Sequence, residues 1–229
     1  MHQELLKLVS QKISRVLQLG MDHLIAPPFC AYCKDFLSER AILCIECQEK
    51  IDPIVSVQIP ITKTYKLTVL AISDYQEPLK SLILAKSRGD IVVSRQLGHL
   101  IWDHTYFKHM PCDYIVPVPL HWLRYAKRGY NQAEEIARVL TEYRHAPVAS
   151  IIKRAKHTPF QSSLSYEKRL PNVKEAFVLN TSDFERFHNK HLVLVDDLMT
   201  TGSTLASCAK IMLPLKPASI TAVVVCRVC

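Results

Sequence analysis

The chain has 229 residues, of which 48% are apolar and 22% charged, and a formal net charge of +8 at neutral pH. This composition excludes a disordered or fibrous protein. The length allows one main domain with a small accessory module, because domains most often run to about 100–150 residues.

The first 26 residues predict an amphipathic helix. Apolar residues recur at three- and four-residue spacing from Leu5 to Leu24, and charged residues interrupt the stretch. Neither a signal peptide nor a spanning segment is expected, since spanning needs about 20 predominantly apolar residues. We therefore expect an intracellular protein whose N-terminal helix packs on its own domain, with packing on lipid or docking of a partner as the alternatives.

Two C-x-x-C pairs, CAYC and CIEC, follow this helix and contribute Cys30, Cys33, Cys44 and Cys47. Four thiolates can surround one zinc ion tetrahedrally, whereas disulfides are the weaker alternative in a reducing compartment. Because four cysteines leave no coordination position for water, the expected zinc is structural. We assign the helix and this module to a first domain, 1–60, and the remainder, 61–229, to a second.

The remainder alternates apolar runs with helical patterns, which predicts an α/β fold with a mostly parallel sheet flanked by helices. The expected strands are 65–73, 113–120, 148–152, 175–179, 191–197 and 220–225. The expected helices are 77–86, 92–103 and one that Asn131 caps.

The segment HWLRYAKRGYNQ mixes cations with aromatic rings, and it opens the most basic part of the chain. Residues 121–174 hold eleven lysine or arginine residues against four glutamates and no aspartate. This excess indicates nucleic acid, anionic lipid or a phosphorylated small molecule as partner, or else a solvated basic face. The rings can stack on bases beside phosphate-binding cations, or pack internally. The candidate contacts are Trp122, Arg124, Tyr125, Lys127, Arg128 and Tyr130.

The motif VLVDDLMTTGST places two acids at the end of an expected buried strand, followed by a turn into a helix. The residues concerned are Asp196, Asp197, Thr200, Thr201, Gly202, Ser203 and Thr204. Ligands of open α/β sheets bind beyond the carboxyl ends of strands, and backbone N–H groups and hydroxyls at a helix start suit a phosphate. The carboxylates suit sugar hydroxyls or a hydrated magnesium ion. The alternative is a capped helix start with surface acids.

This motif resembles the signature of type I phosphoribosyltransferases, which bind 5-phosphoribosyl 1-diphosphate (PRPP). The resemblance implies that Asp196 and Asp197 take the ribose and magnesium side of PRPP. It also implies that residues 200–204 hold the 5′-phosphate. In these enzymes a diphosphate-contacting loop lies in the part of the fold that holds Arg124, Lys127, Arg128 and Tyr130, so diphosphate and nucleic acid could compete there.

The order of the motifs resembles the ComF competence family: the four-cysteine module, VPVPLHWLRYAKRGYNQAE, RAKHTPFQSSLSYEKRLPN and then the acidic signature. The resemblance implies a phosphoribosyltransferase-like fold preceded by a zinc module. It further implies a cytoplasmic protein that handles incoming single-stranded DNA near the inner-membrane uptake channel and recombination proteins, and that is peripheral to the membrane through such partners.

Two further segments enter through this resemblance. In AKSRGD, Lys86 and Arg88 are expected to contact diphosphate or nucleic acid, although Ser87 stands where the family's basic motif is expected to have an aromatic residue. The second segment lies where phosphoribosyltransferases carry a mobile loop, although an ordinary surface excursion is the alternative. Its expected loop residues are Arg154, Thr158, Gln161 and Arg169.

Three functions stay open at this level. The first is a DNA-handling competence factor that uses PRPP as a ligand or regulator. The second is an active phosphoribosyltransferase, for which the donor site is recognisable. The third is a scaffold organised by zinc, which would not bind PRPP. No segment indicates recognition of a purine, pyrimidine or amine acceptor, and no catalytic residue is assigned, because transfer chiefly requires positioned diphosphate, magnesium and acceptor.

Overall fold

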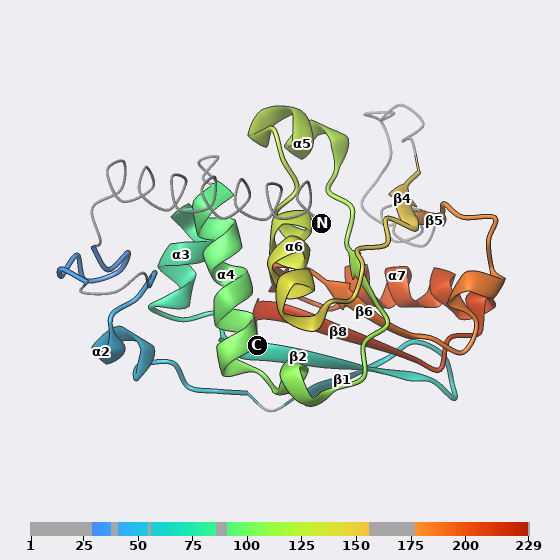
Figure 1. Ribbon diagram of the computed structural model, residues 1–229, viewed down its shortest axis with the longest axis horizontal. Helices are drawn as coiled ribbons and strands as arrows, with labels where there is room; N and C mark the ends of the chain where they lie inside the picture. The colour runs from blue at the N-terminus through green and yellow to red at the C-terminus, as the bar shows by residue number, and fades with distance from the viewer. Residues whose placement is uncertain (1–28, 38–40, 55, 86–90, 156–176, 229) are drawn as a thin grey trace, which may run out of the picture. The chain divides into compact units, whose positions relative to one another are not determined.

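The computed structural model describes residues 29–37, 41–54, 56–85, 91–155 and 177–228 (Figure 1). The chain divides into two compact units, Met1–Gln48 and Glu49–Cys229. The expected helix over the first 26 residues lies outside the described residues. In the first unit, the described regular structure comprises the short helix α2 (Ile45–Gln48) and a bridge between Phe29 and Phe36.

The second unit is built on a six-stranded sheet. Its central path runs in the order β1 (Val57–Pro60), β2 (Lys66–Asp74), β8 (Ser219–Arg227), β6 (His191–Val195) and β3 (Tyr114–Pro117). Only β1 is antiparallel to its neighbour, and β7 (Leu198–Met199) extends the ladder of β8 beyond the end of β6. The predicted mostly parallel sheet is therefore confirmed. Because β1 pairs with β2, residues 57–60 belong to this unit, although the sequence analysis places them in the first domain.

Helices cover both faces of the sheet, which explains why its central strands are apolar throughout. Leu192 and Leu194 of β6 share one core cluster with Leu205 and Met212, so α7 (Ser203–Met212) covers that face. The alternate residues of β6 point to the opposite face. That face is covered by α4 (Ile91–His104) and α6 (Gln132–Arg144), which run side by side in Figure 1.

The remaining described elements are short. They are α3 (Leu79–Ala85), α5 (Trp122–Arg128), β4 (Ile152–Arg154), β5 (Phe177–Leu179) and the 3-10 turns Tyr106–His109, Glu185–Phe187 and Leu213–Leu215. Within the described residues, no helix has the length and apolar character needed to cross a membrane.

Two expected strands take a different place from the one their sequence suggests. Residues 148–152 contribute only a bridge from Val148 to Ile115 at the edge of the main sheet, and the regular strand β4 starts at Ile152. β4 pairs antiparallel with β5 as a separate two-stranded sheet. The apolar residues of these short strands pack into the α7-side core without joining the main ladder, so composition alone does not reveal their pairing.

Candidate functional site

The backbone of the two acids is fixed by the central strand β8. The Asp196 N–H donates to the carbonyl of Val223 at 3.1 Å, and the Asp197 carbonyl accepts from the Val225 N–H at 3.2 Å. The Asp197 N–H also donates to Asp196 Oδ1 at 2.9 Å. Both residues are half-buried at the carboxyl end of β6. The acids therefore project from a rigid strand end and not from a loose loop.

The turn after the acids depends on Gly202. This residue is buried with φ +72°, a conformation that L side chains rarely adopt, and it immediately precedes α7. A Cβ built on Gly202 would stand 2.5 Å from Ile59 Cδ1 of β1. The position therefore accepts only glycine without rearrangement. The role of β1 is not apparent from the sequence, because the strand has only four residues and none of them is fully buried.

The start of α7 presents donors suited to an anion. The N-cap residue of this ten-residue helix is Gly202, which has no side chain, and the Ser203 N–H donates to Thr201 Oγ1 at 3.4 Å. The next N–H groups and the positive dipole end of the helix face the turn. Thr200, Thr201 and Ser203 are exposed, and the Thr201 hydroxyl donates to Ser203 Oγ at 2.9 Å. This donor set fits a phosphate, while the neighbouring carboxylates fit sugar hydroxyls or a hydrated cation. The residues present thus match the requirements of PRPP with magnesium.

Arg154 lies near enough to Asp196 for the two charges to interact. Burial lowers the pKa of Arg154, and nearby Arg124 lowers it further, whereas Cys208 and Asp196 act in the opposite direction. Its guanidinium carbon lies 4.9 Å from the centre of the Phe177 ring. Arg154 therefore occupies the end of β4 beside the Asp196 region. Thr158, Gln161 and Arg169, which the sequence groups with it, lie outside the described residues.

Cys208 of α7 lies close to the same two charged groups. Burial raises the pKa of its thiol, and the negative charge of Asp196 raises it further. The side chain is fully buried in the α7-side core. Cys208 therefore serves as a small apolar residue, because a thiol that stays protonated is a poor nucleophile and a poor metal ligand.

The basic segment after β3 folds into the helix α5, which has no buried residue. His121 caps its start by accepting the Leu123 N–H at Nδ1, and Gly129 ends it with φ +80°. Arg124 and Lys127 are exposed and Arg128 is partly exposed. The rings of Trp122 and Tyr125 are 63% and 50% exposed, so α5 offers both cations and open aromatic faces to solvent.

Tyr130 does not belong to this exposed set. Its side chain is only 6% exposed, and its hydroxyl lies 3.3 Å from Ser94 Oγ of α4. The reason is local: Gly129 reverses the chain into the core, and Asn131 caps α6 directly afterwards. We therefore correct the expected stacking role of Tyr130, since a buried ring has no free face for a base. Lys86 and Arg88 lie outside the described residues.

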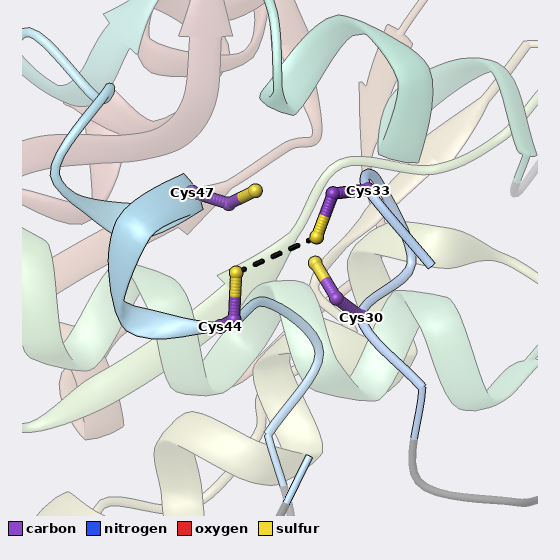
Figure 2. A group of neighbouring side chains, drawn as sticks. All are labelled: Cys30, Cys33, Cys44 and Cys47. Atoms are coloured by element: carbon purple, nitrogen blue, oxygen red, sulfur yellow. Dashed lines mark hydrogen bonds between the residues drawn. The ribbon is translucent and has the colours of Figure 1, made fainter. Parts of the chain in front are cut away.

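The four cysteines of the first unit converge on one point (Figure 2). Their sulfur atoms all lie within 4.8 Å of one another, and Cys33 Sγ is 3.6 Å from Cys44 Sγ. Tetrahedral zinc with Zn–S bonds of about 2.3 Å separates its sulfur ligands by roughly 3.8 Å. The cluster is therefore compatible with a zinc ion. Partial burial raises the pKa of Cys30, but hydrogen bonds from the N–H groups of Cys44, Cys33 and Tyr32 lower it to about 6.

The two C-x-x-C pairs, Cys30–Cys33 and Cys44–Cys47, reach this arrangement in different ways. In the first, the Lys34 N–H donates to the Cys30 carbonyl at 3.0 Å, and Lys34 itself has φ +70°. In the second, Cys44 directly precedes α2, and the Gln48 N–H donates to its carbonyl at 3.0 Å. In the second pair, therefore, a helical turn brings Cys47 back toward Cys44.

Comparison with known proteins agrees with these features. Residues 123–228 match the family described as the phosphoribosyl transferase domain. Competence protein F of Haemophilus influenzae is 34% identical over 193 residues, which cover 81% of this chain and 78% of that protein. DNA utilization protein YhgH of Escherichia coli (strain K12) is 32% identical over 167 residues, which cover 69% and 71%. Competence protein ComFC of Bacillus subtilis is 30% identical over 146 residues, which cover 61% and 55%.

The similarity and the structure lead to the same family. The second unit has the phosphoribosyltransferase type of α/β fold, and the four-cysteine cluster near the N-terminus fits the small zinc module expected before it. The similarity to the Haemophilus protein extends over most of both chains. The chain belongs to the competence protein F (ComF) family.

Proposed function

We propose that the protein is a competence factor that handles incoming single-stranded DNA in the cytoplasm and binds PRPP with magnesium at the end of β6. The observation that carries the PRPP proposal is the acid pair, which β8 holds beside an α7 start whose N-cap is the glycine Gly202. The DNA role is supported by the names of the similar proteins, two of which are called competence proteins and one a DNA utilization protein.

PRPP would be divided between the two halves of this site. Thr200, Thr201, Ser203 and Thr204, with the backbone at Gly202, would hold the 5′-phosphate. Asp196 and Asp197 would take the ribose hydroxyls and the hydrated magnesium ion, which prefers oxygen ligands and keeps several waters. Bound magnesium would supply positive charge to the diphosphate group.

The α5 helix is the proposed surface for single-stranded DNA. Arg124, Lys127 and Arg128 would neutralise phosphates, and the open rings of Trp122 and Tyr125 would stack on bases. The four cysteines would hold a structural zinc ion. Proteins of the DNA-uptake channel and of recombination are the proposed partners, and they would bring this protein to the inner membrane.

Calorimetric titration of the full chain with PRPP and magnesium tests the ligand. Asp196→Asn and Asp197→Asn remove the charge and keep the side-chain shape, so each is expected to weaken magnesium-dependent binding at least tenfold. Glu142→Gln, which neutralises an exposed acid on α6, should titrate like the parent protein. Unchanged PRPP binding in both aspartate variants would refute the assignment.

Retardation of single-stranded oligonucleotides tests the DNA surface. The triple variant Arg124→Gln, Lys127→Gln, Arg128→Gln should bind more weakly. The logarithm of its affinity should also depend less steeply on the logarithm of salt concentration, by about 2 if all three cations contact phosphates.

The matched control removes three exposed cations elsewhere on the same unit: Lys63→Gln, Lys66→Gln and Lys210→Gln. Equal salt dependence in the two triple variants would mean that net charge matters and α5 does not.

Phosphoribosyl transfer is the second candidate function, and the donor site is the observation that favours it. Side chains have little covalent work in such a reaction, because positioned groups and charge stabilisation supply most of the catalysis. Diphosphate release from PRPP, measured with nucleobases, amines and nucleic acids as acceptors, tests this candidate. Absence of acceptor-stimulated release across these classes would leave PRPP as a ligand only.

A further inference from the structure

A cavity of about 530 Å³ lies at the start of α5. One wall is the chain from Pro119 to Trp122, which connects β3 to α5, and the other is residues 153–155 at the end of β4. Pockets for small ligands usually measure about 300–1,000 Å³. The cavity is therefore large enough for one nucleotide, and the proposed function uses Trp122 from its lining but assigns no role to Lys153 or Arg154.

The first wall is aromatic and apolar. The His121 and Trp122 rings lie roughly parallel, 6.0 Å apart between centroids with an interplanar angle of 28°. His121 is held in turn by the hydrogen bond that caps α5. Because Trp122 is 63% exposed, its ring can accept a further planar group. Every base has a π-face, so stacking on this wall would tolerate any base.

The second wall is cationic. Lys153 is exposed, whereas Arg154 is largely withdrawn from water, and its buried Nε has no hydrogen-bond partner among the described residues. None of the described residues that line the cavity is acidic. Arg124 lies near enough to depress the pKa of Arg154, so positive charge is concentrated here. The unpaired Nε of Arg154 and the neighbouring cations Lys153 and Arg124 together favour binding of an anion.

We propose that this cavity binds a single nucleotide unit, with its base stacked on Trp122 and its phosphate held between Lys153 and Arg154. The unit comes either from a free nucleoside monophosphate or from a nucleotide within a single strand. The inference rests on the proposed DNA role and extends it, because it gives one nucleotide a defined binding position. The described residues that line the cavity do not include the turn at residues 200–204, although Asp196 is near enough to Arg154 to affect its pKa.

Fluorescence and calorimetric titrations of the full chain test the cavity. The probes are thymidine 5′-monophosphate, thymidine, inorganic phosphate and a twelve-residue oligothymidylate. The monophosphate is expected to bind at least tenfold more tightly than thymidine or phosphate alone. Trp122→Ala should weaken its binding about 5- to 150-fold, given the usual worth of base stacking. Arg154→Gln should remove the preference for the monophosphate over thymidine.

Leu123→Ala is the matched control for Trp122→Ala. Leu123 is 56% exposed on the same helix but does not line the cavity, so this variant should bind every probe like the parent protein. Trp122 is itself exposed, so its variant should keep the parent melting temperature. Arg154→Lys supplies a second variant that retains the charge, and it should keep part of the preference for the monophosphate.

The two nucleotide sources give different results. Binding of free monophosphate that depends on Trp122 and Arg154 identifies a mononucleotide site. If only oligonucleotide binding depends on Trp122 and Arg154, the cavity binds a nucleotide within a strand. If neither probe responds to Trp122→Ala and Arg154→Gln, the inference is wrong.

PRPP titration of the parent protein separates this inference from the proposed function. Normal PRPP binding without Trp122-dependent nucleotide binding overturns the cavity alone. Trp122-dependent nucleotide binding without any PRPP binding overturns only the PRPP assignment.

Discussion

Gly202 packs directly against Ile59, so that a strand at the edge of the sheet supports the turn of the candidate phosphate site. Gly202→Ala would combine a strained positive φ with a Cβ only 2.5 Å from Ile59 Cδ1. We expect a loss of unfolding free energy of about 1–2 kcal/mol from the positive φ and about 0.5–1.5 kcal/mol from displacing the end of the Ile59 side chain. Chemical denaturation measures this loss.

Gly129 provides the control for this prediction. It also has a positive φ, +80°, but no atom lies within 4 Å of the position that a Cβ would take. Gly129→Ala should therefore cost only the backbone strain, about 1–2 kcal/mol. Ile59→Val removes the clashing Cδ1 and should reduce the additional cost of Gly202→Ala. Equal losses for the two glycine variants would contradict the clash.

Gly98 permits the close approach of α4 and α6. A Cβ at this position would stand 2.8 Å from Val139 Cβ and 3.2 Å from the Ile136 carbonyl oxygen. Alanine gains about 1 kcal/mol over glycine in helix propensity, but overlap in a packed interface costs about 1–3 kcal/mol or more. We expect Gly98→Ala to lower stability by a net 1–2 kcal/mol. In a Val139→Ala background the same change should still lower stability but by less, because alanine removes Cγ1 at 3.0 Å and keeps Cβ at 2.8 Å; a double-mutant cycle measures the difference.

The four-cysteine cluster predicts a metal-dependent first unit. Cys44→Ser removes one thiolate, so the purified protein should contain much less than one zinc ion per chain by elemental analysis. Because structural zinc binding is coupled to folding, the Met1–Gln48 unit should become sensitive to proteolysis. Cys112→Ser, outside the cluster, should keep full metal content. Full metal content in the Cys44 variant would show that this thiolate is not a ligand.

His104 at the end of α4 predicts a pH dependence of stability. Burial lowers the pKa of His104 below its usual 6.5, and its buried Nε2 has no partner among the described residues. Below pH 6.5 the unfolded chain therefore takes up a proton that the folded chain resists, so stability is full above this pH and is lost on acidification. The loss between pH 7 and 5 should be smaller in His104→Gln, as measured by denaturation at each pH. Parallel pH curves for the two proteins would contradict it.

The parts of this fold that are predictable from sequence are those with a strong local signal. Strands β2, β6 and β8 are covered on both faces, so their continuous apolar runs mark them to within two residues at each end. The cysteine cluster follows from its spacing, and the acids from their position after a buried strand. The placement of these side chains agrees with the expected site, whereas its ligands stay a proposal.

The parts that sequence does not reveal depend on long-range packing. Helix α5 has no buried residue, so the sequence lacks the hydrophobic periodicity that would predict a helix there. Tyr130 looks like its exposed neighbours, and only the reversal at Gly129 turns it inward. The pairing of β4 with β5, and the contact between Gly202 and Ile59, join segments that are far apart in the chain.

The position of β8 between β2 and β6 has a consequence for biosynthesis. Arg227 of β8 pairs with Asp74 of β2 at 2.7 Å, although 153 positions separate them in the sequence. The central strand β8 is therefore translated after both of its neighbours, β2 and β6. A nascent chain that stops short of residues 219–227 leaves two exposed strand edges and an acid pair without its anchor. Such unpaired edges invite aggregation. Ribosome-bound intermediates of this length should therefore depend strongly on chaperones.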